Sequence, residues 1–253
     1  MQQGFWIRNG SKDVAELIEL AVAAEQGGWD GVFVSDAVME GHNDPLTLLA
    51  AIATATDEIA LGTWVIPLPA RDVLAVARGA AMVDALSRGR LLLGLGLGNA
   101  VEHAALGVGR TGLGDRYDAG IEVLTELLAG GTVSRHDRWF DLEGVSLQTP
   151  PVRDGGPPLL LAVQSESEAP LRRAARWGGL VPSVPDVDPA ALRRHVSGYR
   201  DLGGDGPIAV MGHSSFGAAW DEAVEELDVD WLLQCGNLDA AALRQGPAAL
   251  GAT

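Results

Sequence analysis

The stretch from Gly89 to Gly107, "GRLLLGLGLGNAVEHAALG", combines two residue types that suggest chemistry. Its glycines follow an apolar run, as they do in loops that hold the phosphates of a dinucleotide. His103 follows Glu102, and an imidazole that titrates near neutral pH can donate a proton to a substrate. His103 is therefore a candidate catalytic residue, with an ordinary surface histidine as the alternative.

The spacing of the glycines argues against a dinucleotide loop. The fingerprint G-x-G-x-x-G requires its third glycine three residues after the second. From Gly94 and Gly96 the third position is Asn99. From Gly96 and Gly98 it is Val101. Small residues that alternate with leucine instead favour a strand with one crowded face and one well-packed face.

Metal-dependent and nucleophilic chemistry find little support. None of the five histidines forms H-x-H or H-E-x-x-H, so no metal site is expected. No G-x-S-x-G elbow occurs, and Cys235, the single cysteine, has no base beside it in sequence. His213, Ser214 and Ser215 follow an apolar run, which suggests either a phosphate-binding loop or an ordinary polar loop.

Composition limits the partners and the compartment. The 253 residues carry a net charge of −16, which disfavours binding to nucleic acid or to an anionic membrane surface. A single cysteine permits no internal disulfide, in keeping with a reducing cytoplasm. The beginning of the sequence has no apolar signal region, and the apolar segments are interrupted before about 18 residues, so no membrane span is expected.

Short apolar runs alternate with helical stretches, such as those at 72–87 and 115–130. Eight strands are predicted, at 4–7, 31–36, 59–68, 90–97, 157–163, 178–183, 207–212 and 230–236. Eight strand–helix units predict a single closed (β/α)8 TIM barrel over residues 1–253, with a small hairpin excursion near 132–148. An open doubly wound sheet is the alternative. In a barrel, functional groups lie in the loops after the carboxyl ends of the strands.

The quoted stretch belongs to a longer pattern that resembles a known family. The pattern runs from "AVAAEQGGWDGVFVSD" through "IALGTWVIPLP" to "DALSRGRLLLGLGLG", and the likeness continues to "PLRRAARWGG". It resembles the luciferase-like monooxygenases, which are (β/α)8-barrel oxidoreductases that use reduced flavin mononucleotide (FMN) or a deazaflavin coenzyme. The resemblance implies that the cofactor ring lies in the barrel mouth.

The resemblance also assigns site residues. It implies that Asp36 lies near the ring, where it is a candidate catalytic residue together with His103. His42, a nearby imidazole on a different part of the same loop, is the third candidate catalytic residue. The resemblance further implies that Thr63, Trp64, Gly98, Asn99, Arg116 and Tyr117 lie near the ring or its side chain. Gln164, Ser165 and Ser167 complete the candidate cofactor-binding set, because the two serine hydroxyls can donate hydrogen bonds to a phosphate. Glycine permits close approach of a flat ring, and Trp64 is suited to stack on it, although tight strand packing and a core aromatic are the alternatives.

Two positions depart from the family pattern. Many relatives have a histidine directly after the aspartate that ends the second strand, where this chain has Ala37. Relatives often have a glycine-rich approach to the helix after the fifth strand, where this chain has Glu166 and Glu168. A carboxylate competes with a phosphate for a helix N-terminus. The alternative to a redox enzyme is therefore a barrel that has lost its cofactor and acts as a binding protein, a partner subunit or a cofactor-free enzyme.

The function predicted from these observations is a flavin- or deazaflavin-dependent oxidoreductase, acting by hydride transfer or monooxygenation on a small organic substrate. The cofactor would supply the redox chemistry and the protein would supply position and a dry pocket. A homodimer is also expected, because the predicted helix at 72–87 carries small residues that permit close packing. These are Ala75, Ala77, Gly79, Ala80 and Ala81. Packing of the same residues against the barrel itself is the alternative.

Overall fold

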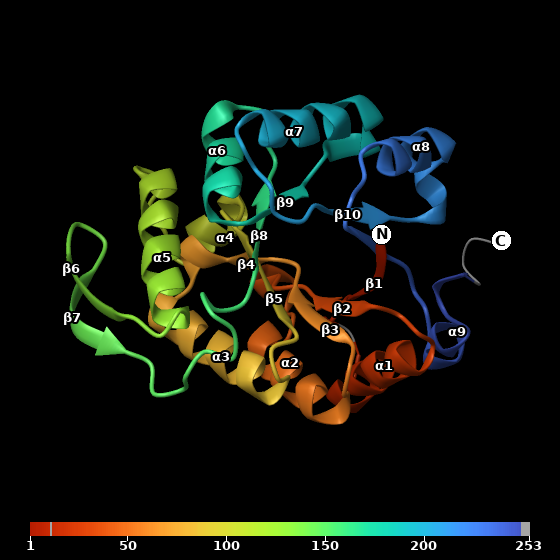
Figure 1. Cartoon of the computed structure of the whole chain (residues 1–253), viewed down its shortest axis with the longest axis horizontal. Helices are drawn as coiled ribbons and strands as arrows, with labels where there is room; N and C mark the ends of the chain where they lie inside the picture. Colours follow the sequence, from red (N-terminus) through yellow and green to blue (C-terminus); the bar gives the residue numbers. More distant parts are fainter. Residues whose placement is uncertain (11, 249–253) are drawn as a thin grey trace.

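The computed structural model describes residues 1–10 and 12–248 as a nearly closed parallel barrel surrounded by helices (Figure 1). Its eight strands follow the order β10-β11-β1-β2-β3-β5-β8-β9, and a single bridge between Leu180 and Ile208 joins the two ends. The predicted (β/α)8 barrel is confirmed, and the open sheet is wrong. The strands are β1 (Gln2–Ile7), β2 (Gly31–Val34), β3 (Ala60–Thr63), β5 (Leu91–Gly96), β8 (Leu159–Val163), β9 (Gly179–Pro182), β10 (Ala209–Gly212) and β11 (Trp231–Gln234).

The run predicted as one strand at 59–68 is divided in two. β3 ends at Thr63 and pairs with β5 as far as Leu92, and β4 (Ile66–Pro67) resumes the pairing with β5 at Leu95. The peptide bond between Trp64 and Val65, in the gap, is cis. The division brings Val65 and Pro67 to the mouth of the barrel.

Helices cover the outside of the barrel. In chain order they are α1 (Val14–Gln26), α2 (Pro45–Ala55), α3 (Val73–Leu86), α4 (Ala100–Ala105), α5 (Leu113–Leu128), α6 (Glu168–Trp177), α7 (Pro189–Asp201), α8 (Ala218–Glu226) and α9 (Ala240–Arg244). Asp44 caps α2 and Asp72 caps α3, each by accepting a backbone N–H from the first turn. No helix in the part of the chain that the structure describes is long and apolar enough to cross a bilayer.

Side chains fill the lower part of the barrel. Phe33, Trp231 and Leu233 belong to a buried cluster inside the strands, and the rings of Phe33 and Trp231 meet edge to face at 5.3 Å. A Cβ atom at Gly62 would lie 2.1 Å from the Phe33 ring, so glycine is required there for close packing. The interior is thus a packed core, and any ligand site must lie above it.

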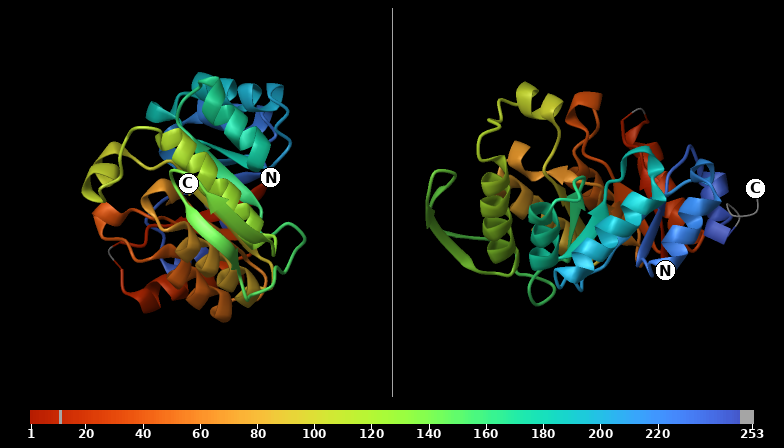
Figure 2. Two further views of the ribbon diagram at one scale, coloured as in Figure 1. Left: turned by 90° about the vertical axis from the view of Figure 1, so that its left-hand side faces the viewer. Right: turned by 90° about the horizontal axis from the view of Figure 1, so that it is seen from above.

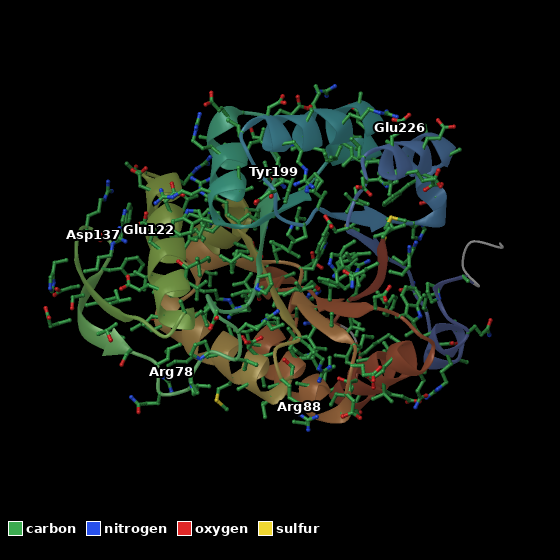
Figure 3. All side chains as sticks on the ribbon, in the orientation of Figure 1. Arg78, Arg88, Glu122, Asp137, Tyr199 and Glu226 are labelled. Atoms are coloured by element: carbon green, nitrogen blue, oxygen red, sulfur yellow. The ribbon has the colours of Figure 1, made fainter. Side chains whose placement is uncertain are left out.

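A two-stranded hairpin, β6 (Thr132–His136) and β7 (Asp141–Ser146), extends beside α5 (Figures 1 and 2). Arg135 joins it to the body, because its guanidinium binds Glu122 of α5 at 2.8 Å and also Asp137 of the hairpin. Figure 3 labels these two acidic residues, one on the helix and one on the hairpin. These two hydrogen bonds to carboxylates raise the pKa of Arg135. The hairpin lies within the range 132–148 where the sequence predicts an excursion.

The small residues of α3 largely face inward. Ala77 and Ala80 are fully buried and Ala81 is 9% exposed, all three within the main core. Gly79 faces α2, where a Cβ atom would lie 2.8 Å from Leu46. Ala77, Ala80 and Ala81 thus pack against the barrel and Gly79 approaches α2, as the alternative expects, whereas Ala75 is exposed.

Candidate functional site

A cavity of about 420 Å³ opens at the carboxyl ends of β2, β4, β5 and β8. Its walls are mainly apolar and include Val65, Pro67, Leu161, Ala162 and Pro170. We call this cavity the mouth pocket. Its position and size are those expected for a small-molecule site in a (β/α)8 barrel.

The structure brings half of the predicted site residues to the mouth pocket. Those that line it are Asp36, Gly98, Asn99, Tyr117, Gln164 and Ser165. The others lie outside its lining and are His42, Thr63, Trp64, His103, Arg116 and Ser167. The functional roles of all twelve stay predictions.

Asp36 lies at the end of β2, buried at 7% exposure. Arg71 forms a two-point ion pair with it, and its Nε lies 3.0 Å from Oδ2 of the carboxylate. Burial raises the pKa of Asp36, and the Arg71 guanidinium offsets part of that increase. Asp36 also borders a second cavity of about 670 Å³ between α2 and α3, so its carboxylate lies between two spaces.

His42 is held away from the mouth pocket. Its Nδ1 lies 2.9 Å from Oγ of Ser35, and its Nε2 lies 3.4 Å from Glu40. It lines a separate cavity of about 380 Å³ beside Arg8 and Lys12. Ala37, which takes the place of the family histidine, lines the mouth pocket itself, so His42 does not replace that histidine in space.

The segment after β5 forms a short helix. Oδ1 of Asn99 accepts the backbone N–H groups of Val101 and Glu102 at 3.0 Å, and Glu102 reaches back to the N–H of Asn99. This capping box begins α4. It also brings Glu102, at 6% exposure, into the mouth pocket. The pattern "NAVE" is the signal that would have identified Glu102.

His103 stabilises the same segment from behind. Its Nε2 donates to the carbonyl oxygen of Leu97 at 2.8 Å, and the residue is 4% exposed. The expectation of an ordinary surface histidine is therefore wrong. Gly98 has a φ of +84°, and a Cβ atom there would lie 2.8 Å from Nε2 of His103. Glycine is needed at this position for both backbone conformation and space.

Gly96 shapes the floor of the mouth pocket. A Cβ atom at Gly96 would lie 2.7 Å from a methyl group of Val65, so the glycine lets Val65 pack against β5. Thr63, by contrast, is fully buried and donates its hydroxyl to the Gly94 carbonyl at 2.7 Å. Trp64 meets the Phe33 ring edge to face at 6.0 Å. Of these three neighbouring residues only Val65 lines the pocket, and the residue pattern alone does not single it out.

Tyr117, on α5, has a buried hydroxyl without a hydrogen-bond partner among the described residues. Burial raises the pKa of its phenol, so the hydroxyl keeps its proton and remains a donor at neutral pH. Arg173 of α6 lies over the ring, 5.2 Å from its centroid, and is fixed by Asp118. A buried hydroxyl without a partner is costly. Its position on the pocket wall is consistent with a ligand that accepts its hydrogen bond.

The two acidic residues at the start of α6 are directed toward cations. Glu166 forms a bidentate pair with Arg194 of α7 at 2.7 and 2.9 Å, and this hydrogen bonding lowers the pKa of Glu166. Glu168 pairs with Arg172 on its own helix. Neither carboxylate lines the mouth pocket, whereas Ser165 does. The expected competition with a bound phosphate is therefore reduced by ion pairs, one to α7 and one within α6.

Comparison with known proteins identifies the family. A family model described as luciferase-like monooxygenase matches residues 1–248. The chain belongs to this family. The luciferase-like resemblance seen in the sequence is thereby confirmed.

Three similar proteins illustrate the range of this luciferase-like family. An "F420-dependent glucose-6-phosphate dehydrogenase" of Mycobacterium avium is 33% identical over 163 residues, which are 58% of this chain and 47% of that protein. The monooxygenase RslO1 of Streptomyces bottropensis has the same fold, with a TM-score of 0.80 at 19% identity over 97% of both chains. The oxygenating constituent of 3,6-diketocamphane monooxygenase from Pseudomonas putida, solved in complex with FMN, has a TM-score of 0.68 at 19% identity over 83% of this chain and 66% of that one. The chain spans about half the length of the curated relatives that it matches.

Proposed function

We propose that this luciferase-like protein is an oxidoreductase that binds reduced FMN or a deazaflavin coenzyme in the mouth pocket and acts on a small organic substrate. The observation that carries the proposal is the apolar-walled mouth pocket at the carboxyl end of the barrel, whose lining includes Tyr117, a residue with a buried hydroxyl that pairs with none of the described residues. Named relatives that depend on F420 or contain FMN support this choice of cofactor.

The residues of the mouth pocket fit a flat heterocycle with polar edges. Val65 and Leu161 form apolar walls, and Gly96 has no side chain that would project into the base of the pocket. Tyr117 supplies a hydrogen-bond donor for a ring oxygen or nitrogen, and Ser165 supplies a hydroxyl toward the start of α6. These groups would hold the cofactor.

When bound, such a cofactor supplies hydride transfer or, as a flavin, activation of oxygen. The protein contributes position, exclusion of water and proton handling. Asp36 and Glu102 are buried carboxyl groups in the pocket lining, and the carboxyl group of Asp36 can hold a proton there. The raised pKa of Asp36 favours its protonated form more than in an exposed aspartate.

Binding tests the proposal directly. Purified protein is mixed with reduced FMN or with coenzyme F420 and passed over a gel-filtration column while cofactor absorbance is recorded. We expect one of the two to co-elute at micromolar concentration. Ala162→Phe, which fills the mouth pocket, should abolish co-elution, whereas Ala50→Phe, in the cavity between α2 and α3, should preserve it. Co-elution of neither cofactor with the unaltered protein would refute the proposal and favour the cofactor-free barrel.

The oligomeric state is a separate part of the proposal. The outer side of α3 still exposes Ala75, Met82 at 49% and Leu86 at 41%. An exposed apolar helix face is suited to contact with a second copy of the chain. A homodimer through this face is the arrangement that we expect, with the contact made by these residues rather than by Ala77, Ala80 and Ala81.

A further inference from the structure

The cavity that His42 lines differs from the mouth pocket in position and in charge. It has a volume of about 380 Å³ and lies at the carboxyl ends of β1 and β11. The polar part of its lining includes Arg8, Lys12 and His42, and the apolar part includes Phe5, Leu20 and Leu238. We call it the basic cavity. Its described lining has no residue in common with the mouth pocket or with the cavity between α2 and α3.

Cations outnumber carboxylates in the basic cavity. Arg8 is exposed, lies over the Trp6 ring at 5.7 Å from its centroid, and forms no ion pair in the part of the chain that the structure describes. Lys12, the single lysine of the sequence, pairs with Glu16. Glu40 is the only carboxylate in the described lining. The other two cavities are each lined by more carboxylates than cations, so this excess of positive charge in a chain of net charge −16 favours an anionic ligand.

His42 can add a hydrogen-bond donor to the same cavity. Its side chain is 6% exposed, and its Nδ1 lies 2.9 Å from Oγ of Ser35. When the Ser35 hydroxyl donates to Nδ1, the proton of the neutral ring is on Nε2, which makes no hydrogen bond to a described residue. A Cβ atom at Gly10 would lie 2.5 Å from the ring, so the glycine leaves space beside it. A buried polar atom of this kind indicates a ligand that completes its hydrogen bonding.

Hydrogen bonds between two loops hold these groups together. Nδ2 of Asn9, in the loop after β1, donates to the carbonyl oxygen of Ser35 at 2.9 Å. Nδ2 of Asn43, in the loop after β2, donates to the carbonyl oxygen of Asn9 at 2.8 Å. The right-hand view of Figure 2 shows the two loops side by side at one edge of the barrel. The cavity is therefore organised before a ligand binds, which lowers the cost of binding.

We propose that the basic cavity binds a small organic monocarboxylate with an apolar body, about the size of benzoate. The carboxylate accepts two N–H groups of the Arg8 guanidinium and one from Nε2 of His42, and the apolar body lies against Leu20 and Leu238. Inorganic phosphate would leave these apolar side chains uncovered. The basic cavity can be occupied whether or not a cofactor lies in the mouth pocket, because the two described linings share no residue.

Isothermal titration calorimetry of the whole chain with benzoate, benzyl alcohol and inorganic phosphate tests the proposal. We expect benzoate to bind, and benzyl alcohol, which keeps the ring and lacks the charge, to bind about tenfold more weakly. Arg8→Gln should weaken benzoate binding about tenfold, because it removes the unpaired cation. Glu40→Gln should strengthen it about threefold, because the Glu40 carboxylate, 3.4 Å from Nε2 of His42, competes with the ligand.

A matched control is Arg88→Gln. It also removes one positive charge from an exposed arginine, labelled in Figure 3, that does not line the basic cavity, so the affinity for benzoate should not change. Absence of benzoate binding, equal affinities for benzoate and benzyl alcohol, or equal effects of Arg8→Gln and Arg88→Gln would overturn the proposal. Phosphate that binds as tightly as benzoate would overturn the choice of an apolar carboxylate.

Two measurements separate the basic cavity from other effects. Tighter binding by Glu40→Gln supports the site in a way that partial unfolding of a variant could not imitate, and unchanged or weaker binding by this variant counts against it. Cofactor co-elution is measured on the same variants and should equal that of the unaltered protein. Benzoate binding without any cofactor binding would support the basic cavity and refute only the proposed redox function.

Discussion

Tyr117→Phe should have opposite effects on stability and on cofactor binding. The substitution removes one hydroxyl and leaves the ring, which is 2% exposed, in place against Arg173. In the free protein that hydroxyl is buried and pairs with no residue of the described ranges, at a cost of about 1–3 kcal/mol. Its removal should therefore raise the free energy of unfolding by about 1 kcal/mol, which corresponds to about 2–4 °C in Tm for a chain of this size.

Cofactor binding should change in the other direction. If the hydroxyl donates to the bound ring, the variant loses one hydrogen bond worth about 1 kcal/mol, so its Kd should rise about fivefold. The assay is thermal unfolding with and without saturating cofactor. Without cofactor, the Phe variant should unfold at a higher temperature than the unaltered protein. Saturating cofactor should then increase the Tm of the variant by less than it increases the Tm of the unaltered protein.

The only other tyrosine provides a matched control. The hydroxyl of Tyr199, which lies beneath α7 (Figure 3), donates to the Gly178 carbonyl at 2.7 Å. Tyr199→Phe should lower the free energy of unfolding by about 1 kcal/mol and leave cofactor affinity unchanged. A Tyr117→Phe variant that is less stable than the unaltered protein without cofactor, as Tyr199→Phe is expected to be, would refute the reasoning about an unpartnered hydroxyl.

Three further predictions follow from other regions. Burial acts to raise the pKa of Glu25, but hydrogen bonds from three backbone N–H groups at 2.8–3.0 Å outweigh burial, and the pKa lies below its ordinary value of 4.5. The stabilisation that the Glu25 carboxylate provides is therefore present above pH 4.5 and is lost in more acidic solution. Glu25→Gln should cost about 1–2 kcal/mol in urea unfolding at pH 7, and a cost that persists unchanged at pH 3 would contradict this account. Gly98→Ala should destabilise more than Gly107→Ala, because both glycines have positive φ but only Gly98 faces His103, and equal melting temperatures would argue against the contact. Met82→Arg should halve the mass measured by light scattering, and an unchanged dimer would remove the outer side of α3 as the interface.

The strand pattern and the barrel were predictable because they depend on local information. Runs such as "LLLGLG" are apolar throughout, as strands buried on both faces must be, and helical stretches with capping residues separate them. Eight repeats of this unit leave few alternatives for the topology. The break at Trp64 and Val65 was not predictable in the same way, because the run "IALGTWVIPL" is uniformly apolar and its pairing with β5 depends on tertiary packing.

The candidate site required the tertiary structure. Sequence order does not specify which loop residues converge, so His42 and Asp36 were proposed together although they border different cavities. Glu102 was passed over because its burial depends on the cap that Asn99 forms. The pairing of Glu166 with Arg194, 28 residues further along the chain, likewise depends on the packing of α6 against α7. Residue types and periodicity thus determined the architecture, and the resemblance of its motifs indicated the family, whereas long-range packing decided which side chains share the pocket and which of its polar groups pair with none of the described residues.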